Sequence, residues 1–277
     1  MNKQTLTNNT HRELEILDQL RLSGGSCRIK FLAERIGVTE QTVRRNIRVL
    51  ESNGRVRKVH GGVQLIEAQN EAPFQTRMNV RPEAKKEVAA SVADMISDGD
   101  SLFLDIGSTT AYVAMALQNH HELLIITNSV AVAHTLVSRN NNRVFFSGGE
   151  LRSHDGGSFG EGAIDFIHQF NMQYAILSVG AIDSERGFML HDMQEAKVSR
   201  EAMARAQTTV IAGDSGKFGR RAPICIAEPE EFDILISDKR PSPAIADMLQ
   251  RNDIDLVLSG AQQKSRSSNN YASLNSG

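Results

Sequence analysis

Short apolar runs alternate with helical patterns between about residues 81 and 260, and this alternation restricts the fold more than any other feature. Runs such as SLFLDI, LLIIT and RVFFSGG are only a few residues long, and stretches with helical spacing separate them. Further apolar runs of the same kind are YAILSVGAI, TTVIAGDS, ICIA and DILISD. Strands that alternate with helices form parallel sheets whose two faces the helices cover. The sequence therefore predicts an α/β domain with a parallel sheet over residues 81–260.

The N-terminal part of the chain has a different pattern. Three helical patterns cover residues 11–24, 27–37 and 39–54, and Thr39 is a good N-cap for the third. The next segment, RVRKVHGGVQLI, alternates as a hairpin does and has two glycines at its centre. These elements predict a small winged helix-turn-helix over residues 10–66. We expect residues 67–80 to be a linker and the polar residues 261–277 to be a disordered tail.

Charge is divided unevenly between the two predicted domains. Residues 1–66 hold 12 Lys and Arg against 6 Asp and Glu, which is +6, whereas the whole chain has a formal net charge of −2. The remaining residues therefore carry −8. A basic head on an acidic body indicates two domains with different partners.

The third predicted helix carries an amphipathic basic pattern. On a helix, Val43, Ile47 and Leu50 fall on one side, and polar and basic residues fall on the other. Such a face is often only solvated, but here a short helix precedes it through IGVTE, and a basic hairpin follows it. This order is typical of a helix-turn-helix with a wing, in which guanidinium groups and Gln contact bases and the wing contacts phosphates. The expected DNA contacts are Thr39, Gln41, Thr42, Arg44, Arg45, Arg48, Arg57, Lys58 and His60.

Two polar segments follow apolar runs in the second domain. DIGSTT places Ser108, Thr109 and Thr110 at the start of a predicted helix, where hydroxyl and N–H groups favour an anion, although they could also be plain helix caps. TNS places Thr127 and Asn128 at the end of another predicted strand. Ligands of open parallel sheets bind beyond the carboxyl ends of strands. We therefore expect both segments to contribute to one binding site.

Three later segments give weaker signals. FFSGGELR has two glycines that allow close backbone approach, and its Arg152 could hold a phosphate. Glu195 and Lys197 form either part of the site or an ordinary exposed pair, and Lys217 either meets an anion or is solvated. No Ser-His-Asp, metal-ligand or phosphate-binding Walker pattern is present, so we expect no catalytic residue, no metal and no cofactor.

The segment LAERIGVTEQTVRRNIRVLESNGRVRKVHGG resembles the N-terminal signature of the DeoR family of bacterial repressors. The order of DIGSTT, TNS, GGELR and DSGKFG resembles the same family, whose C-terminal domain is similar in fold to ribose-5-phosphate isomerase and senses phosphorylated sugars. The resemblance implies effector contacts from Asp105, Ser108, Thr109, Thr110, Thr127, Asn128, Arg152 and Lys217. Gly107, Gly149 and Glu195 complete the expected effector contacts. The chain departs from the family pattern at Asn46 and Tyr174, where Asp is common, and at Gly216, where Ser is common.

The resemblance implies a cytoplasmic repressor of a carbohydrate operon that binds double-stranded operator DNA and is released by a phosphorylated sugar. Because one short helix reads DNA weakly, we also expect a homo-oligomer. The N-terminus is polar and no apolar run is long enough for a membrane span, so no membrane partner is expected. The alternative is a phosphosugar isomerase with an added DNA-binding head, whose base would be Asp105, Asp192 or Glu195. A purely structural DNA-binding protein would leave the second domain unexplained.

Overall fold

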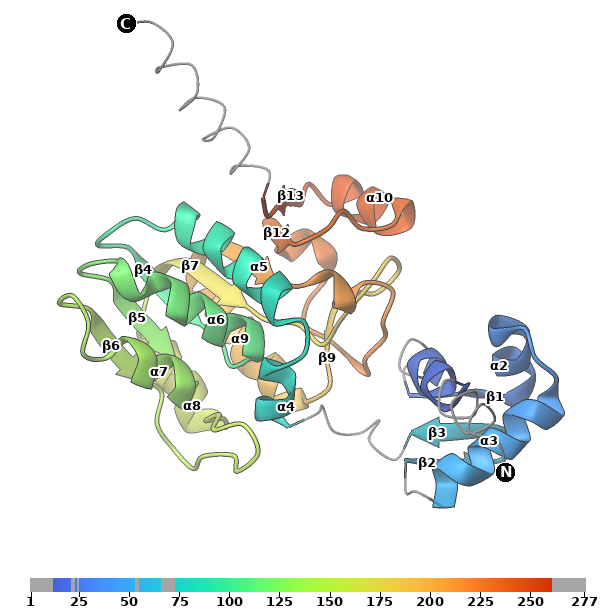
Figure 1. The fold of residues 1–277 in the computed structure, drawn as a ribbon. Helices are drawn as coiled ribbons and strands as arrows, with labels where there is room; N and C mark the ends of the chain where they lie inside the picture. The colour runs from blue at the N-terminus through green and yellow to red at the C-terminus, as the bar shows by residue number, and fades with distance from the viewer. Residues whose placement is uncertain (1–11, 21–22, 24, 53–54, 66–72, 261–277) are drawn as a thin grey trace, which may run out of the picture. The chain divides into compact units, whose positions relative to one another are not determined.

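The computed structural model describes residues 12–20, 23, 25–52, 55–65 and 73–260 (Figure 1). The chain divides into two compact units, with the boundary between residues 72 and 73, and the short segment 219–223 is grouped with the first unit. Gly54, residues 67–72 of the expected linker and the expected disordered tail at 261–277 lie outside the described residues. No helix in the described ranges is both long and apolar enough to cross a membrane.

The first unit is a winged helix-turn-helix. Residues 12–20 are helical and precede β1 (Ser26–Arg28), α2 (Ile29–Ile36), α3 (Glu40–Ser52), β2 (Val56–Val59) and β3 (Gly62–Leu65). Strand β3 pairs antiparallel with both β1 and β2, and Gly61 has a φ of 72° in the predicted turn between β2 and β3. One expectation was wrong, because residues 27–28 form a strand and not the start of a helix. Pairing with β3, which is distant in sequence, outweighs their local helical pattern.

A single apolar cluster holds the first unit together. Val43, Ile47 and Leu50 of α3 are buried together with Leu20 and Leu32 of the two preceding helices. The apolar side of α3 therefore faces the core, as its spacing predicted, and most of its other side chains are exposed. Asn46 is the exception on the buried side, and it donates a hydrogen bond to the carbonyl oxygen of Thr42 at 2.9 Å.

A seven-stranded parallel sheet forms the centre of the second unit, with the strand order β13-β12-β10-β7-β4-β5-β6. The strands are β4 (Ser101–Leu104), β5 (Leu124–Thr127), β6 (Arg143–Phe146), β7 (Met172–Leu177), β10 (Ala206–Ala212), β12 (Ile234–Ser237) and β13 (Asp255–Leu258). The helices are α5 (Pro82–Met95), α6 (Ser108–Ala116), α7 (Val130–Leu136), α8 (Glu161–Ile167), α9 (Met193–Ala204) and α10 (Pro243–Arg251). Short 3-10 turns lie at Leu117–Asn119, Ser215–Lys217 and Pro229–Glu231.

Helices cover both faces of this sheet, which confirms the predicted α/β class. Leu102 and Leu104 of β4 pack into the same apolar cluster as residues of α5, α6 and α7. Phe103, between them, points to the other face and packs with residues of α8, α9 and α10. Neighbouring residues of one strand thus enter different cores, since successive side chains of a strand alternate between faces. Helices α5 and α6 lie side by side over the sheet (Figure 1).

A second, three-stranded sheet was not expected. It is antiparallel, with the order β11-β9-β8, and its strands are β8 (Ala181–Asp183), β9 (Gly187–Leu190) and β11 (Ile224–Cys225). The apolar run at 174–182 therefore divides between β7 and β8, and the run at 224–227 belongs to the small sheet. The sequence predicted that both runs belong to the parallel sheet. This was wrong for the end of the first run and for the second run, because apolar content does not specify which strand another strand pairs with.

The short helix α4 (Phe74–Met78) lies in the segment that was expected to be a linker. The main-chain N–H of Phe74 donates to the carbonyl oxygen of His154 at 3.4 Å, and the Tyr112 hydroxyl donates to the carbonyl oxygen of Met78 at 3.1 Å. Phe74 is also buried. Helix α4 is therefore tied to α6 and to the loop around His154 within the second unit.

Candidate functional site

The start of α3 has the cap that the sequence predicted. The main-chain N–H of Thr42 donates to the hydroxyl of Thr39 at 3.2 Å, which satisfies one of the unpaired donors of the first helical turn. Gly37 has a φ of 65° and ends α2, as glycine does at helix C-termini. The turn between the two helices thus follows directly from the IGVTE segment.

The predicted DNA contacts lie on the exposed parts of α3 and the β2–β3 hairpin. Thr39, Gln41, Arg44, Arg45, Arg48, Arg57, Lys58 and His60 are exposed, and Thr42 is half-buried. Arg44 pairs with Glu40 at 3.2 Å, Arg57 donates to Gln64 at 2.9 Å, and Lys58 pairs with Glu51. Exposed ion pairs contribute little stability, so these basic groups remain available to phosphates.

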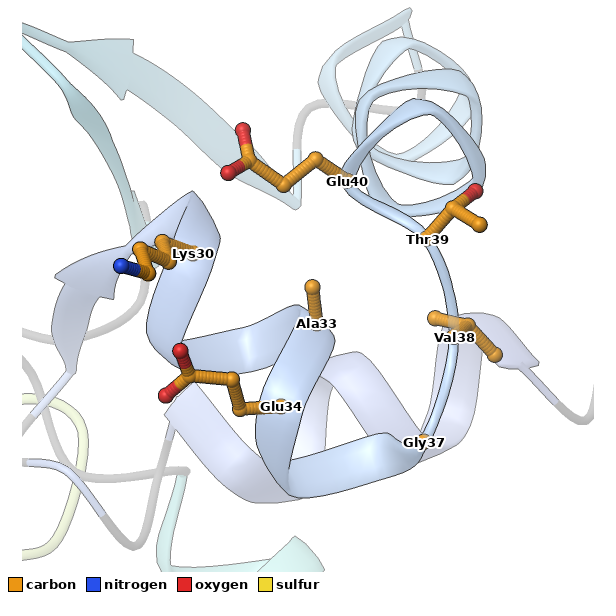
Figure 2. Close-up of a pocket in the computed structure, with 7 residues that line it drawn as sticks. All are labelled: Lys30, Ala33, Glu34, Gly37, Val38, Thr39 and Glu40. Carbon is orange, nitrogen blue, oxygen red and sulfur yellow. The ribbon is translucent and has the colours of Figure 1, made fainter.

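A shallow hollow of about 460 Å³ lies between α2 and the start of α3 (Figure 2). Lys30, Glu34 and Glu40 supply its charged side chains. Two carboxylates against one ammonium do not favour an anion in this hollow.

The segments DIGSTT and TNS meet at one edge of the parallel sheet. Strands β4 and β5 are neighbours, with Leu104 opposite Thr127, so the residues that follow them lie side by side. The Thr127 hydroxyl donates to the carbonyl oxygen of Leu104 at 2.6 Å and accepts from the N–H of Ser129 at 3.0 Å. Thr127 therefore joins the two strand ends and is less available to a ligand than the sequence suggested.

The N-terminus of α6 has no side-chain cap. Its N-cap is Gly107, and α5, α8 and α10 likewise lack a side-chain cap, whereas α7 and α9 are capped by the side chains of Ser129 and Asp192. Ser108, Thr109 and Thr110 are buried in the first turn, and Thr110 donates to the carbonyl oxygen of Gly107 at 3.1 Å. Uncapped N–H groups and the positive end of the helix dipole favour an anion here.

Arg152 follows β6 and lies among carboxylates. Its guanidinium donates to Asp155 and Glu195, lies 3.5 Å from Asp192, and stacks over the ring of Phe159 at 4.2 Å. Burial alone would lower the pKa of Arg152, but the two carboxylates outweigh burial and raise it. Arg152 is thus permanently charged and already paired on several sides. Gly149, earlier in the same loop, has a φ of 96° that favours glycine.

Asp105 is buried at the carboxyl end of β4 and accepts a hydrogen bond from the N–H of Ile106 at 2.7 Å. Burial raises the pKa of its carboxyl well above the ordinary value, and the charge of Glu195 raises it further. The Asn128 side chain lies close to the Asp105 carboxyl and acts to lower its pKa. The two side chains nevertheless make no hydrogen bond of normal geometry. The structure therefore brings Asp105, Asn128, Arg152 and Glu195 into one group.

Lys217 lies in a different group on the same edge of the sheet. It follows β10, and β7 lies between β10 and β4 in the sheet. Burial lowers the pKa of the nearby Lys85, and the charge of Lys217 lowers it further. Lys85 is 3.8 Å from Asp214, and Arg81 is 3.5 Å from Asp214 and 3.1 Å from Asp238. This ion-pair cluster fastens the start of α5 to the ends of β10 and β12.

The three departures from the family pattern lie outside the Asp105 group. Asn46 belongs to the first unit, and Tyr174 packs against the apolar cluster under α5 and α6. A side chain at Gly216 would place its Cβ 2.7 Å from Asp214 and 2.8 Å from Arg81, so glycine leaves room for that ion pair. Asp155 and Phe159 were missed from the sequence, and the only signal was the spacing of Arg152 and Asp155 in one tight loop.

Two protein-family descriptions match most of the chain. Residues 12–69 match a DeoR-like helix-turn-helix domain, and residues 80–239 match a DeoR C-terminal sensor domain. The chain belongs to the DeoR family. It is a transcription regulator with a DNA-binding helix-turn-helix, as the resemblance predicted.

Members of the DeoR family from Escherichia coli K12 are similar over nearly their whole length. The transcriptional repressor CsqR is 38% identical over 84% of this chain and 90% of its own, and the glycerol-3-phosphate regulon repressor is 35% identical over 82% and 90%. Both are named as repressors and neither as an enzyme. Ribose 5-phosphate isomerase A from Methanocaldococcus jannaschii matches 50% of the chain and 54% of its own, with 13% identity and a TM-score of 0.37. That score is too low to carry a functional argument.

Proposed function

We propose that this DeoR-family regulator represses a carbohydrate operon and is released from its operator by a phosphorylated sugar. The observation that carries the sensing half is the N-terminus of α6 beside the end of β5, where an anion would meet N–H groups that no side chain caps. The name of the glycerol-3-phosphate regulon repressor supports a phosphate ester as the effector class. A regulator of chromosomal DNA works in the cytoplasm, and the operator would be read by a homo-oligomer.

The DNA half of the proposal rests on α3 and the hairpin. Arg44, Arg45 and Arg48 are exposed on α3, and their apolar neighbours are fixed in the core, so the helix presents them on a rigid support. Arg57 and Lys58 on β2 would add phosphate contacts that set the register of the protein on DNA.

Helix α4 offers a route from the effector site to the DNA-binding unit. The His154 carbonyl that accepts from Phe74 lies between Arg152 and Asp155, and the Tyr112 that donates to Met78 belongs to α6. Both elements of the candidate effector site thus contact the first helix of the second unit. An effector that moves the loop or α6 would move α4, which directly follows the residues that join the units.

The DNA proposal is tested with a duplex that wild-type protein selects from a randomised pool. Losing a base contact costs about 1–3 kcal/mol and relaxes specificity at one position, whereas losing one phosphate contact lowers the salt slope by about 1. We expect the first result for Arg44→Ala or Arg45→Ala and the second for Lys58→Ala. An unchanged affinity of the double variant Arg44→Ala, Arg45→Ala at moderate salt would rule out α3 as the recognition helix.

Isomerisation is the second candidate, because the buried Asp105, whose carboxyl pKa is raised, lies near Glu195, as paired carboxyl groups do in proton-transfer enzymes. We expect no turnover of ribose 5-phosphate or hexose phosphates. Product formation that disappears in Asp105→Asn or Glu195→Gln would establish the enzyme instead.

A further inference from the structure

Three residues carry buried polar atoms that lack hydrogen-bond partners: Asn128 and Ser147, which follow β5 and β6, and Ser158, in the loop that continues from β6. These atoms are Nδ2 and Oδ1 of Asn128 and the hydroxyls of Ser147 and Ser158, and none has a partner among the residues that the structure describes. Asn128 and Ser158 are fully buried, and Ser147 is 7% exposed. Buried polar groups in native proteins are nearly always paired, so unpaired ones call for a water or a ligand.

The three residues are neighbours through the backbone. The N–H of Ser147 donates to the carbonyl oxygen of Thr127 at 3.0 Å, and the N–H of Ser158 donates to that of Asn128 at 2.9 Å. Asn128 also lies beside Asp105. These unpaired atoms of Asn128, Ser147 and Ser158 therefore lie next to the candidate effector site, whereas the other unpaired buried atoms of the second unit, Nδ1 of His120 and the hydroxyl of Ser237, lie apart from one another.

The chemistry of these atoms selects hydroxyl groups over phosphate. An amide presents both a donor and an acceptor, whichever way it is oriented, and a serine hydroxyl can do either. A phosphate dianion only accepts, so it would leave the amide oxygen of Asn128 unpaired. A hydroxyl group on a ligand can donate to that oxygen and accept from the amide nitrogen or a serine.

Nearby charges also keep the phosphate away from this position. The guanidinium of Arg152 is occupied by Asp155 and Glu195, so the surroundings of this loop carry more negative than positive charge. The N-terminus of α6 has no carboxylate as its cap. A ligand with a phosphate at one end and hydroxyls at the other would match both environments.

We propose that Asn128, Ser147 and Ser158 form a hydroxyl-binding subsite that holds the polyol part of the effector, while its phosphate lies at the N-terminus of α6. This subsite rests on the proposed sensing function and gives it a selectivity: phosphate esters with hydroxyl groups bind, and those without bind poorly. Ser147 and Ser158 are thereby added to the effector site, and Arg152 positions the loop around them.

The test is calorimetric titration of the full chain with ribose 5-phosphate, glucose 6-phosphate, glycerol 3-phosphate and ethyl phosphate. Ethyl phosphate keeps the phosphate but has no hydroxyl group on its carbon chain. The variants are Ser158→Ala and Ser147→Ala, and the matched control is Ser237→Ala. Ser237 is equally buried and equally unpaired, but it lies on β12, three positions away from β4 in the sheet.

For the tightest polyol phosphate, loss of one hydrogen bond should weaken binding about 5–30-fold in Ser158→Ala or Ser147→Ala. Ser237→Ala should bind as wild type does, and ethyl phosphate should bind weakly and alike to all four proteins. Without ligand, both site variants should melt close to wild type, since the removed hydroxyls have no protein partner.

Two results would overturn the subsite. If the polyol phosphates bind wild type and both site variants equally, the unpaired atoms hold only ordered water. If the site variants lose stability without ligand and keep their affinity, the hydroxyls are structural. Failure of every phosphate ester to bind wild type is a separate result, which would overturn the proposed sensing function together with the subsite.

Discussion

Arg152 shows at the scale of single residues how surroundings limit a side chain's role. The sequence suggested that this side chain could hold a phosphate, but the structure places its guanidinium against Asp155, Glu195 and the ring of Phe159. An incoming phosphate would have to displace carboxylates that are already charge-paired. Its role as a direct effector contact stays a prediction, and its position favours ordering the loop.

The buried carboxyl of Asp105 should make stability depend on pH. Because the folded-state pKa is raised, the neutral form contributes stability below the ordinary value of about 3.9, and this contribution is lost as pH rises toward the folded-state pKa. Asp105→Asn should therefore gain thermal stability relative to wild type as pH rises from 4 to 7. Melting curves across this range test it, with the exposed Asp165→Asn as the control. A constant difference between Asp105→Asn and wild type would contradict the burial argument.

Gly107 is restricted by contact with Ser178. An added Cβ at Gly107 would lie 2.2 Å from the Ser178 hydroxyl and 2.7 Å from its Cβ. Gly107→Ala should thus destabilise the protein by about 1–3 kcal/mol, as overpacking does. The free energy of unfolding, measured with denaturant, should be partly restored when Ser178→Gly is added to Gly107→Ala. If the two changes destabilise the protein additively, the contact between them is not the cause.

At the scale of elements, α4 is the connection whose removal should uncouple sensing from DNA binding. Tyr112→Phe deletes the hydrogen bond to Met78 and leaves the packing of α6 in place. We expect near-normal affinity for the selected DNA duplex and for the best phosphate ester. The change in DNA affinity caused by that ester, typically about 5–150-fold in allosteric proteins, should shrink.

Tyr174→Phe is the matched control for this experiment, since Tyr174 is also half-buried and packs against the same apolar cluster as Tyr112, but it lies on β7. Fluorescence titrations of DNA with and without the ester measure the coupling in both variants. A normal response of Tyr112→Phe would show that the signal does not depend on the bond to α4.

At the scale of the whole molecule, the two units have separate apolar cores. Residues of α3 and its neighbours form one cluster, and those on the two faces of the parallel sheet form others. We therefore expect calorimetry to resolve two unfolding transitions. A phosphate ester at about 100 times its dissociation constant should stabilise the sensor unit by about 2.7 kcal/mol and shift its transition. Arg44→Ala should leave that shift intact, and a single transition would contradict independent cores.

Local sequence pattern was enough to predict several features of this protein. Apolar spacing assigned the buried side of α3, Thr39 and Gly37 specified its turn, and the alternation of strands and helices identified the parallel sheet. The position of DIGSTT and TNS after strands was sufficient to predict that they meet, since parallel strands end at one edge.

Which distant residues become partners depends on how the folded chain packs. No local pattern indicates that β8, β9 and β11 leave the main sheet, that Lys217 joins Arg81 and Lys85, or that Glu195 meets Arg152. The same holds for Ser147 and Ser158, which look like ordinary loop serines until both are found buried and unpaired beside Asn128. Such pairings depend on strand order and burial, and these are properties of the packed chain that a side chain's sequence neighbours do not specify.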